Sequence, residues 1–171
     1  EKMLNYIQNA DLAICGYKMV KEFNSKIETR SIPSKLYNKE NMIEILCNSD
    51  MINILWNKIF KLDIIKNNGI KFDESEFRGE DLLFNLDYIK NIKNIYVTED
   101  VLYNYIMKNS GLNMGYNEKL STKLKRNKKV HNKMMEISKK DRKKITIFTT
   151  KNYLKHFNMF IKSRIKRVLK R

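Results

Sequence analysis

The sequence is poor in the residues that interrupt helices. Its 171 residues include one proline, Pro33, and only five glycines. Because proline breaks a helix interior and glycine weakens it, this scarcity allows long helices. A chain of this length can bury one ordinary core. A content of 42% hydrophobic and 11% aromatic residues indicates a globular rather than a disordered chain.

Long apolar runs and cysteine pairs are also missing. No stretch of about 18 uncharged apolar residues is present, which excludes a membrane-spanning helix, and no signal peptide is recognisable at the start. Cys15 and Cys47 each lie in an apolar segment, so we expect buried reduced thiols rather than a disulfide. They have neither the spacing nor the neighbouring histidine of a metal site. Since the first residue is Glu1 rather than Met, we expect the chain to be a piece of a longer protein.

Charge of the two signs is unevenly distributed. The formal net charge is +16, yet residues 1–117 carry a net charge of −1 and residues 118–171 carry +17. This contrast predicts two parts with different surroundings: a near-neutral globular body over 1–117 and a basic helical arm over 118–171.

Hydrophobic periodicity predicts a mixed α/β fold in which helices dominate. The body is predicted to contain helices at 2–9, 38–46, 49–69 and 80–92, a buried strand at 11–20, and an exposed hairpin or loop at 22–35. It is also predicted to contain a short extended piece at 70–72, two short strands within 94–107, an acidic loop at 73–79 and a loop at 108–117. Asn38 and Ser49 are expected to cap the second and third of these helices. Residues 118–171 are predicted to be helical.

Two adjacent acids, Glu80 and Asp81, stand at the start of the predicted helix 80–92. Acids in a first helical turn complement the helix dipole, which is reason enough for many such pairs. A carboxylate held rigidly at a helix start, behind a loop, can also act as a general base toward an attacking hydroxyl. The pair alone does not decide between these two interpretations.

Trp56, Asn57 and Lys58 lie within the predicted helix 49–69. In a helix, Trp56 would share a face with Phe60, and Asn57 would point away from it. One interpretation is a core tryptophan with solvated polar neighbours. The other is a sugar-binding platform, because an aromatic ring beside hydrogen-bonding groups suits a pyranose.

The order and spacing of four motifs are more specific than any one of them. They are LWNKIF (55–60), KLDIIKNNGIKF (61–72), GEDLLFNLDYI (79–89) and VLYNYIMKNSGL (101–112). Together they resemble the C-terminal half of bacterial family 2 glycosyltransferases of the GT-A type, and DLAICGYKMV (11–20) is similar to a strand of that family. The resemblance covers roughly residues 1–117.

This resemblance implies that the chain is the C-terminal portion of a GT-A glycosyltransferase fold, followed by basic helices. It implies transfer of a sugar from a nucleotide diphosphate donor to a hydroxyl of a glycan or lipid-linked acceptor, in the synthesis of cell-surface polysaccharides such as capsule. Asp81 matches the family's proposed general base in an inverting reaction, with Glu80 as its neighbour. Trp56 and Asn57 match residues on the acceptor side, and Lys58 beside them is a third candidate for substrate binding.

Two features of the family are missing from this chain. One is the donor half, with the D-x-D motif that holds Mn²⁺ or Mg²⁺ under the diphosphate, and no carboxylate cluster replaces it. We therefore expect Mn²⁺ or Mg²⁺ in the full-length enzyme, with ligands outside this chain, and we expect the chain alone to be inactive. The other is an arginine that often follows the Y-x-Y pair. Here Ile106 follows, and Lys108 is the nearest candidate for a phosphate contact.

The segment 153–169 has an amphipathic helical pattern, with one apolar stripe made of Leu154, Phe157, Phe160, Ile161, Ile165, Val168 and Leu169. Three interpretations are open: residues 153–171 lie on an anionic membrane surface, pack on the body, or bind nucleic acid. Nucleic acid is the least favoured, because no nucleic-acid motif is present and the aromatic residues follow the stripe. The competing class of function is thus a non-enzymatic basic helical module. In either class we expect a cytoplasmic protein, peripheral on the inner face of the membrane if the arm binds lipid.

Overall fold

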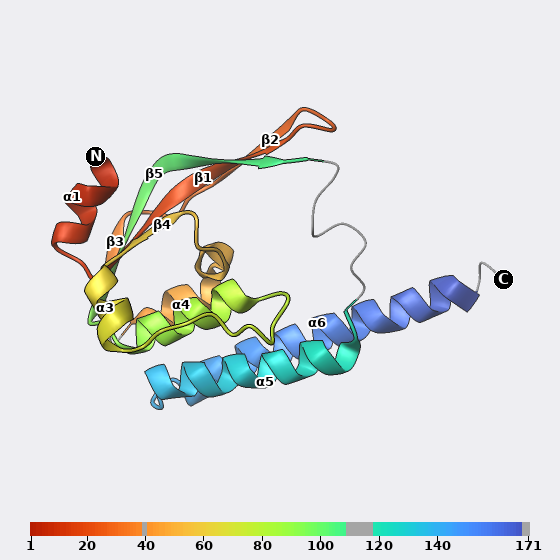
Figure 1. The fold of residues 1–171 in the computed structure, drawn as a ribbon. Coiled ribbons are helices and arrows are strands. Elements are labelled where there is room, and N and C mark those ends of the chain that lie inside the picture. Colours follow the sequence, from red (N-terminus) through yellow and green to blue (C-terminus); the bar gives the residue numbers. More distant parts are fainter. Residues whose placement is uncertain (39–40, 109–117, 169–171) are drawn as a thin grey trace.

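The protein is a mixed α/β structure built in layers. The computed structural model describes residues 1–38, 41–108 and 118–168, with side chains at all of these except 163, 164 and 166–168. A curved sheet forms the upper layer, and α4 (Glu80–Lys90) lies beneath it. The pair α5 (Leu120–Ile137) and α6 (Arg142–Val168) lies below α4 (Figure 1). The predicted mixed α/β fold, dominated by helices, is confirmed.

The sheet is mixed and is centred on two parallel strands. β1 (Leu12–Lys21) runs parallel to β5 (Asn94–Met107). Antiparallel neighbours complete it: β2 (Lys26–Arg30) and β4 (Lys58–Phe60) pair with β1, and β3 (Lys35–Asn38) pairs with β5. β4 pairs with the first residues of β1 and β2 with the last, so the two follow each other along one edge. Between these two pairings stands Gly16, where a Cβ would lie 2.9 Å from the carbonyl oxygen of Arg30.

Several predicted elements are confirmed. Helix α1 (Lys2–Gln8), the buried strand β1 and helix α4 lie where the periodicity placed them. The exposed segment predicted at 22–35 as a hairpin or loop contains the turn and the second strand of a hairpin that β1 forms with β2. Helix α3 (Leu62–Asn67) ends at the expected Asn-Asn-Gly stop, where Gly69 has a φ of +57°. Cys15 is buried, Cys47 is half-buried, and both thiols are free.

The single helix predicted over 49–69 is wrong. Ser49 does cap a helix, since its Oγ accepts a hydrogen bond from the Met51 amide at 3.1 Å, but that helix is a short 3-10 turn, η1 (Asp50–Asn53). The chain then turns, forms β4 and resumes as α3. The edge of β1 explains the difference: the Cys15 amide donates to the Asn57 carbonyl at 3.0 Å, and β4 continues that pairing. Tertiary hydrogen bonding thus overrides the local helical pattern.

Two smaller predictions are also wrong. Asn38 ends β3 instead of capping α2 (Met42–Asn48), whose N-cap is Asn41. Residues 94–107 form one strand rather than two. Ile14 pairs with Val97 and Tyr17 with Tyr103, so β5 holds extra residues opposite β1 and absorbs the expected break as a bulge. Residues 109–117 of the last predicted loop lie outside the described residues.

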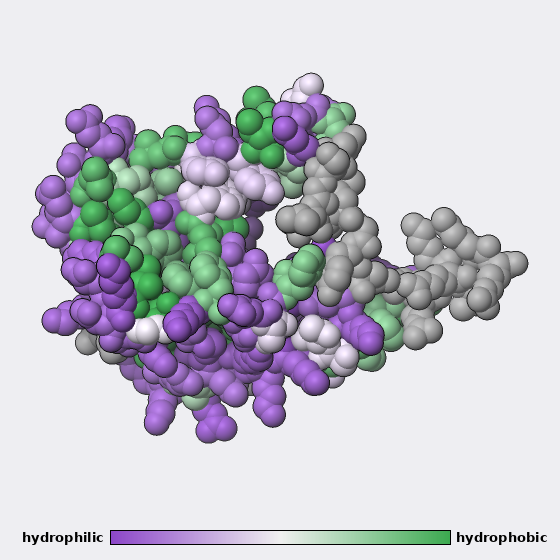
Figure 2. Space-filling model, viewed as in Figure 1, coloured by the Kyte–Doolittle hydropathy of each residue, from purple (hydrophilic) through white to green (hydrophobic). Residues whose placement is uncertain are grey.

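The core lies between the sheet and the lower helices. Side chains of β1, α2, α4 and β5 make up most of it, and Val130, Met134 and Ile137 of α5 and Ile145 of α6 are buried in the same cluster. The first part of the basic segment therefore packs on the body, while the boundary at residue 118 stays a prediction. Hydrophilic side chains gather over the lower helical layer in Figure 2. None of the helices in the described part of the chain has an apolar stretch long enough to cross a bilayer.

Candidate functional site

A cavity opens at the start of α4. It has a volume of about 360 Å³ and is lined by Asn53, Phe77, Arg78, Gly79, Glu80 and Asp81. The loop between α3 and α4 contributes Phe77, Arg78 and Gly79 to this lining, α4 itself contributes Glu80 and Asp81, and η1 contributes Asn53. Both predicted acids therefore line one solvent-accessible space. Asn53 and Arg78 were not singled out by the sequence, because nothing in their local pattern distinguishes them from ordinary loop residues.

The two acids differ in their surroundings. Burial raises the pKa of Asp81 above the usual value, the neighbouring Glu80 carboxylate raises it further, and the positive charge of Lys58 opposes the shift. One carboxylate oxygen of Glu80, Oε2, is buried and accepts no hydrogen bond from the described residues. A carboxylate with a raised pKa that faces a cavity is suited to accept a proton from a bound hydroxyl.

Asn57 and Lys58 hold the turn before β4 together. Asn57 is 1% exposed and its Nδ2 donates to the Cys15 carbonyl at 3.2 Å. The Lys58 ammonium donates to Met51 O at 2.5 Å, to Asn57 Oδ1 at 2.8 Å and to the Ile54 carbonyl. Burial lowers the pKa of Lys58 to about 7. Neither residue lines the cavity, and in this structure both stabilise the segment that carries Asn53.

Asn85 supports the same segment from below. It is fully buried on α4, and its Nδ2 donates to the carbonyls of Ile52 at 2.6 Å and Ile54 at 3.1 Å. Asn85 is not among the residues predicted from the sequence. The available signal was a polar side chain on the apolar face of helix 80–92, since a buried amide has to find hydrogen-bond partners.

Trp56 lies in an aromatic cluster rather than on a helix. Its ring stacks on Tyr103 and Tyr105, with centroids 4.6 and 5.0 Å away, and meets Tyr17 edge-on at 4.7 Å. The tryptophan is half-buried and Tyr103 is 38% exposed, so part of the cluster faces solvent. Lys108 is exposed directly after β5. The structure places neither Trp56 nor Lys108 in the wall of the cavity.

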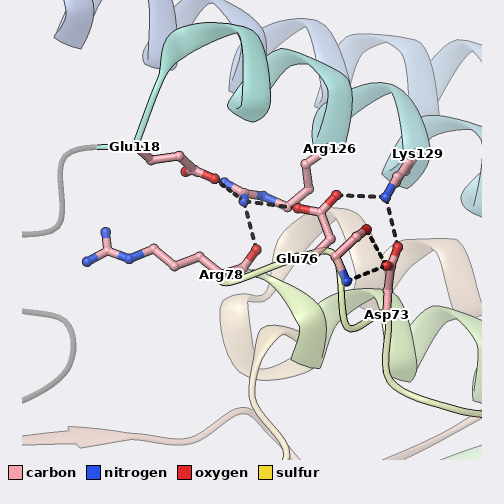
Figure 3. Close-up of polar contacts among 7 residues, drawn as sticks. Asp73, Glu76, Arg78, Glu118, Arg126 and Lys129 are labelled. Carbon is pink, nitrogen blue, oxygen red and sulfur yellow. Dashed lines mark hydrogen bonds and ion pairs between the residues drawn. The ribbon is translucent and has the colours of Figure 1, made fainter.

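A network of ion pairs fixes the loop that leads to the acids (Figure 3). Arg126 of α5 donates two hydrogen bonds to the Glu118 carboxylate, at 2.5 and 2.8 Å, and lies 3.5 Å from Glu76. Its Nη1 also donates to the Arg78 carbonyl at 2.7 Å, one residue before Gly79. The guanidinium of Arg78 itself points away from this network. Arg126 thus ties α5 directly to the backbone at the cavity.

Lys129, one turn further along α5, binds the same loop. Its ammonium donates to Asp73 and to Glu76, both at 2.8 Å. Asp73 in turn accepts from Ser75 Oγ at 2.5 Å, and the Lys129 ammonium together with Ser75 lowers the pKa of Asp73 to about 2. The acidic loop predicted at 73–79 is therefore held by cations of the basic segment.

Gly79, the N-cap of α4, offers a test of this attachment. Its φ is +79°, and a Cβ there would lie 2.7 Å from Cδ of Arg126. Gly69 also has a positive φ, +57°, but a Cβ there would contact nothing within 4 Å. We expect Gly69→Ala to lower the free energy of unfolding by about 1 kcal/mol, from backbone strain alone, and Gly79→Ala by roughly 2–4 kcal/mol. Urea unfolding measures both, and equal losses would show that Arg126 yields without cost.

The described residues contain no group of three or more His, Cys, Asp or Glu side chains that could hold a metal ion. The donor set present in this part of the chain therefore does not fit a Mn²⁺ or Mg²⁺ site. The charged residues that line the cavity are the half-buried pair Glu80 and Asp81, and Arg78 on the loop that α5 holds. A half-buried carboxylate beside a cavity has the chemistry to accept a proton from a polar substrate.

Comparisons with known proteins indicate which class of protein this chain is similar to. No protein-family model matches the chain. Over 113 residues it is 32% identical to the poly(ribitol-phosphate) β-N-acetylglucosaminyltransferase TarP of Staphylococcus aureus, a match that covers 64% of this chain and 32% of TarP. Its fold resembles the crystal structure of S. aureus TarS in complex with UDP-GlcNAc, with a TM-score of 0.65 and 16% identity, over 93% of this chain and 44% of that one.

The chain thus spans about a third of TarP and less than half of the TarS structure. In sequence and in fold it resembles part of a glycosyltransferase, which confirms the resemblance noted from its motifs. The fold likeness concerns architecture alone, since its sequence identity is low. The assignment to family 2 and the roles of individual residues stay predictions.

Proposed function

We propose that this chain is the acceptor-side part of a family 2, GT-A-type glycosyltransferase that builds a cell-surface polysaccharide. The observation that carries the proposal is the cavity at the start of α4, where Glu80 and Asp81 stand together in a chain similar to TarP and TarS. Its partners are a nucleotide-sugar donor and a glycan or lipid-linked acceptor.

Asp81 acts as the general base in this proposal. It accepts the proton of the acceptor hydroxyl, whose oxygen then forms a bond to the anomeric carbon while the bond to the nucleoside diphosphate breaks, with inversion. The raised pKa of Asp81 makes its carboxylate a stronger base. Arg78 brings a positive charge to the same cavity. Trp56 and Lys108 remain candidates for substrate binding. Asn57 and Lys58 act indirectly in this proposal, by holding the segment that carries Asn53.

The donor is expected to bind mainly outside residues 1–171, together with Mn²⁺ or Mg²⁺, whose ligand motif this chain lacks. We therefore propose that the isolated chain transfers no sugar. UDP-GlcNAc is the first donor to test, because it is bound in the TarS structure, and a phosphodiester polyol is the first acceptor, from the name of TarP.

The test is to identify the product made by the natural polypeptide that contains this chain. It is incubated with a panel of nucleotide sugars, Mn²⁺ and an acceptor pool that includes lipid-linked glycans. Mass spectrometry detects the added sugar, and the NMR coupling constant of the anomeric proton gives its configuration. Inversion relative to the donor supports the proposal, and retention contradicts the mechanism. Absence of any product would favour the non-enzymatic basic module.

Glu80 should set the pH at which Asp81 works. Because the Glu80 carboxylate raises the pKa of Asp81, Glu80→Gln removes a like charge and lowers that pKa. The acidic limb of the kcat/KM profile, which reports the free base, is then expected to move to lower pH. The measurement is transfer rate against pH for wild type and Glu80→Gln, with Glu74→Gln, an exposed acid of the same loop, as the control. An unmoved limb in Glu80→Gln would contradict the assignment of Asp81.

A further inference from the structure

Helix α6 has one face that is buried against the rest of the protein and a second face that carries large, exposed apolar side chains. Ile145 and Thr149 are 0% and 5% exposed and face α5 and the core. Leu154, Phe157, Ile161 and Ile165 are large apolar side chains, yet their exposed fractions lie between 40% and 52%. An amphipathic surface helix normally buries its apolar stripe against its own domain.

The exposed stripe is not a continuation of the buried one. Leu154, Phe157, Ile161 and Ile165 recur at intervals of three and four residues, so they share one face. At about 100° per residue, that face lies on nearly the opposite side of α6 from Ile145 and Thr149. The helix also runs beyond the end of α5 (Figure 1). The predicted stripe also included Phe160, which is 36% exposed and lies nearer the buried face. It further included the Val168 side chain and Leu169, which lie outside what the structure describes.

The charge of α6 limits what can cover this stripe. The helix contains nine Lys and Arg residues and no Asp or Glu. Lys151, Lys155 and Lys162 are exposed and follow one flank of the stripe. A second copy of α6 would bring like charges together, and the phosphate backbone of a nucleic acid would leave the leucine and isoleucines in water. An anionic lipid surface offers both an apolar layer and negative headgroups.

We propose that the exposed stripe of α6, defined by Leu154, Phe157, Ile161 and Ile165, docks on an anionic membrane surface. The helix lies in the plane of the interface, with these side chains in the acyl boundary and Lys151, Lys155 and Lys162 at the headgroups. The inference rests on α6 alone and stands whether or not the cavity at α4 transfers a sugar.

The experiment measures binding of the 171-residue chain to lipid vesicles by flotation. One set of vesicles contains phosphatidylcholine alone, and the other contains equal parts of phosphatidylcholine and phosphatidylglycerol. The test variant combines Leu154→Ser, Phe157→Ser and Ile161→Ser. The control variant combines Ile27→Ser, Leu36→Ser and Leu62→Ser, three exposed apolar residues outside α6 whose exposed fractions are 51–61%. Circular dichroism confirms that each variant is folded.

We expect the wild type and the control variant to bind the anionic vesicles, with weaker binding at high salt. The test variant should lose at least ~100-fold in vesicle partition coefficient, since three apolar side chains that the bilayer would bury become polar. Equal binding by the test variant would overturn the proposal, because charge alone would then explain it. Two other measurements could also overturn the proposal. The first is sedimentation, if it shows that the wild type self-associates through the stripe and does not bind vesicles. The second is competition with a labelled RNA, if the wild type binds the RNA in preference to the vesicles. Failure of the wild type to bind anionic vesicles would overturn it directly.

Discussion

Asp81→Asn is expected to lower kcat for acceptor-dependent sugar transfer by about 10²–10⁴-fold, the usual effect of losing a general base. Asparagine has nearly the same shape but cannot accept the proton. The variant should fold, because Asp81 is only half-buried and its charge is already disfavoured by burial and by Glu80. The rate is measured on the natural polypeptide that contains this chain, with saturating donor and acceptor.

Asp87→Asn is the matched control for this prediction. Asp87 lies on the same helix, and its carboxylate pairs with Lys133 of α5 away from the cavity lining. Asp87→Asn should leave kcat within a factor of about two, because Asp87 does not line the cavity and a partly exposed ion pair contributes little to stability. Asp81→Asn activity equal to that of wild type would leave Glu80 and Asp81 as helix starters only.

Arg126→Leu is expected to lower the free energy of unfolding by about 3–5 kcal/mol, the usual cost of leaving buried charges without their partner. The side chains of Arg126 and Glu118 are 13% and 4% exposed, and that of Glu76 is 6% exposed. Removing the guanidinium takes both hydrogen bonds from the buried Glu118 carboxylate and one from the Arg78 carbonyl, and leaves Glu76 with Lys129 as its remaining cation. Urea unfolding followed by circular dichroism measures the loss.

Two further variants separate this cost from a general effect of charge removal. Lys90→Gln breaks an exposed pair with Glu136, 42% and 53% exposed, and should cost no more than about 1 kcal/mol. Combining Arg126→Leu with Glu118→Leu should recover part of the stability, since one uncompensated charge disappears. If Arg126→Leu costs no more than Lys90→Gln, the network does not hold the loop.

The helix at 80–92 and the segment 49–69 show what the sequence could and could not predict. The first was predicted because its apolar spacing and its acidic start both favour a helix, and the structure agrees. The second has equally good apolar spacing, but its middle becomes β4. A three-residue strand exists only where β1 offers a free edge, and that edge is formed by residues more than forty positions earlier in the chain.

The site was predictable only where its residues are adjacent in the sequence. Glu80 and Asp81 form a recognisable pair. The attachment of the preceding loop to α5 could not be predicted, because Arg126 and Glu118 come from the basic segment. They reach the loop only after α5 packs on α4. The excess of charge over 118–171 suggested a separate arm with an external partner. In the structure, three of these cations form ion pairs with acids of this chain: Arg126 with Glu118, Lys129 with Asp73, and Lys133 with Asp87.

Release of nucleoside diphosphate from a nucleotide sugar, with and without acceptor, tests the central claim most directly. The natural polypeptide that contains residues 1–171 is supplied with Mn²⁺, each donor in turn, and the acceptor pool. The proposal predicts that one donor, with UDP-GlcNAc tested first, releases its diphosphate at a rate that rises strongly when acceptor is added. A rate of release that is the same with and without acceptor, or no release from any donor, would contradict the proposal that the α4 cavity is the acceptor side of a glycosyltransferase.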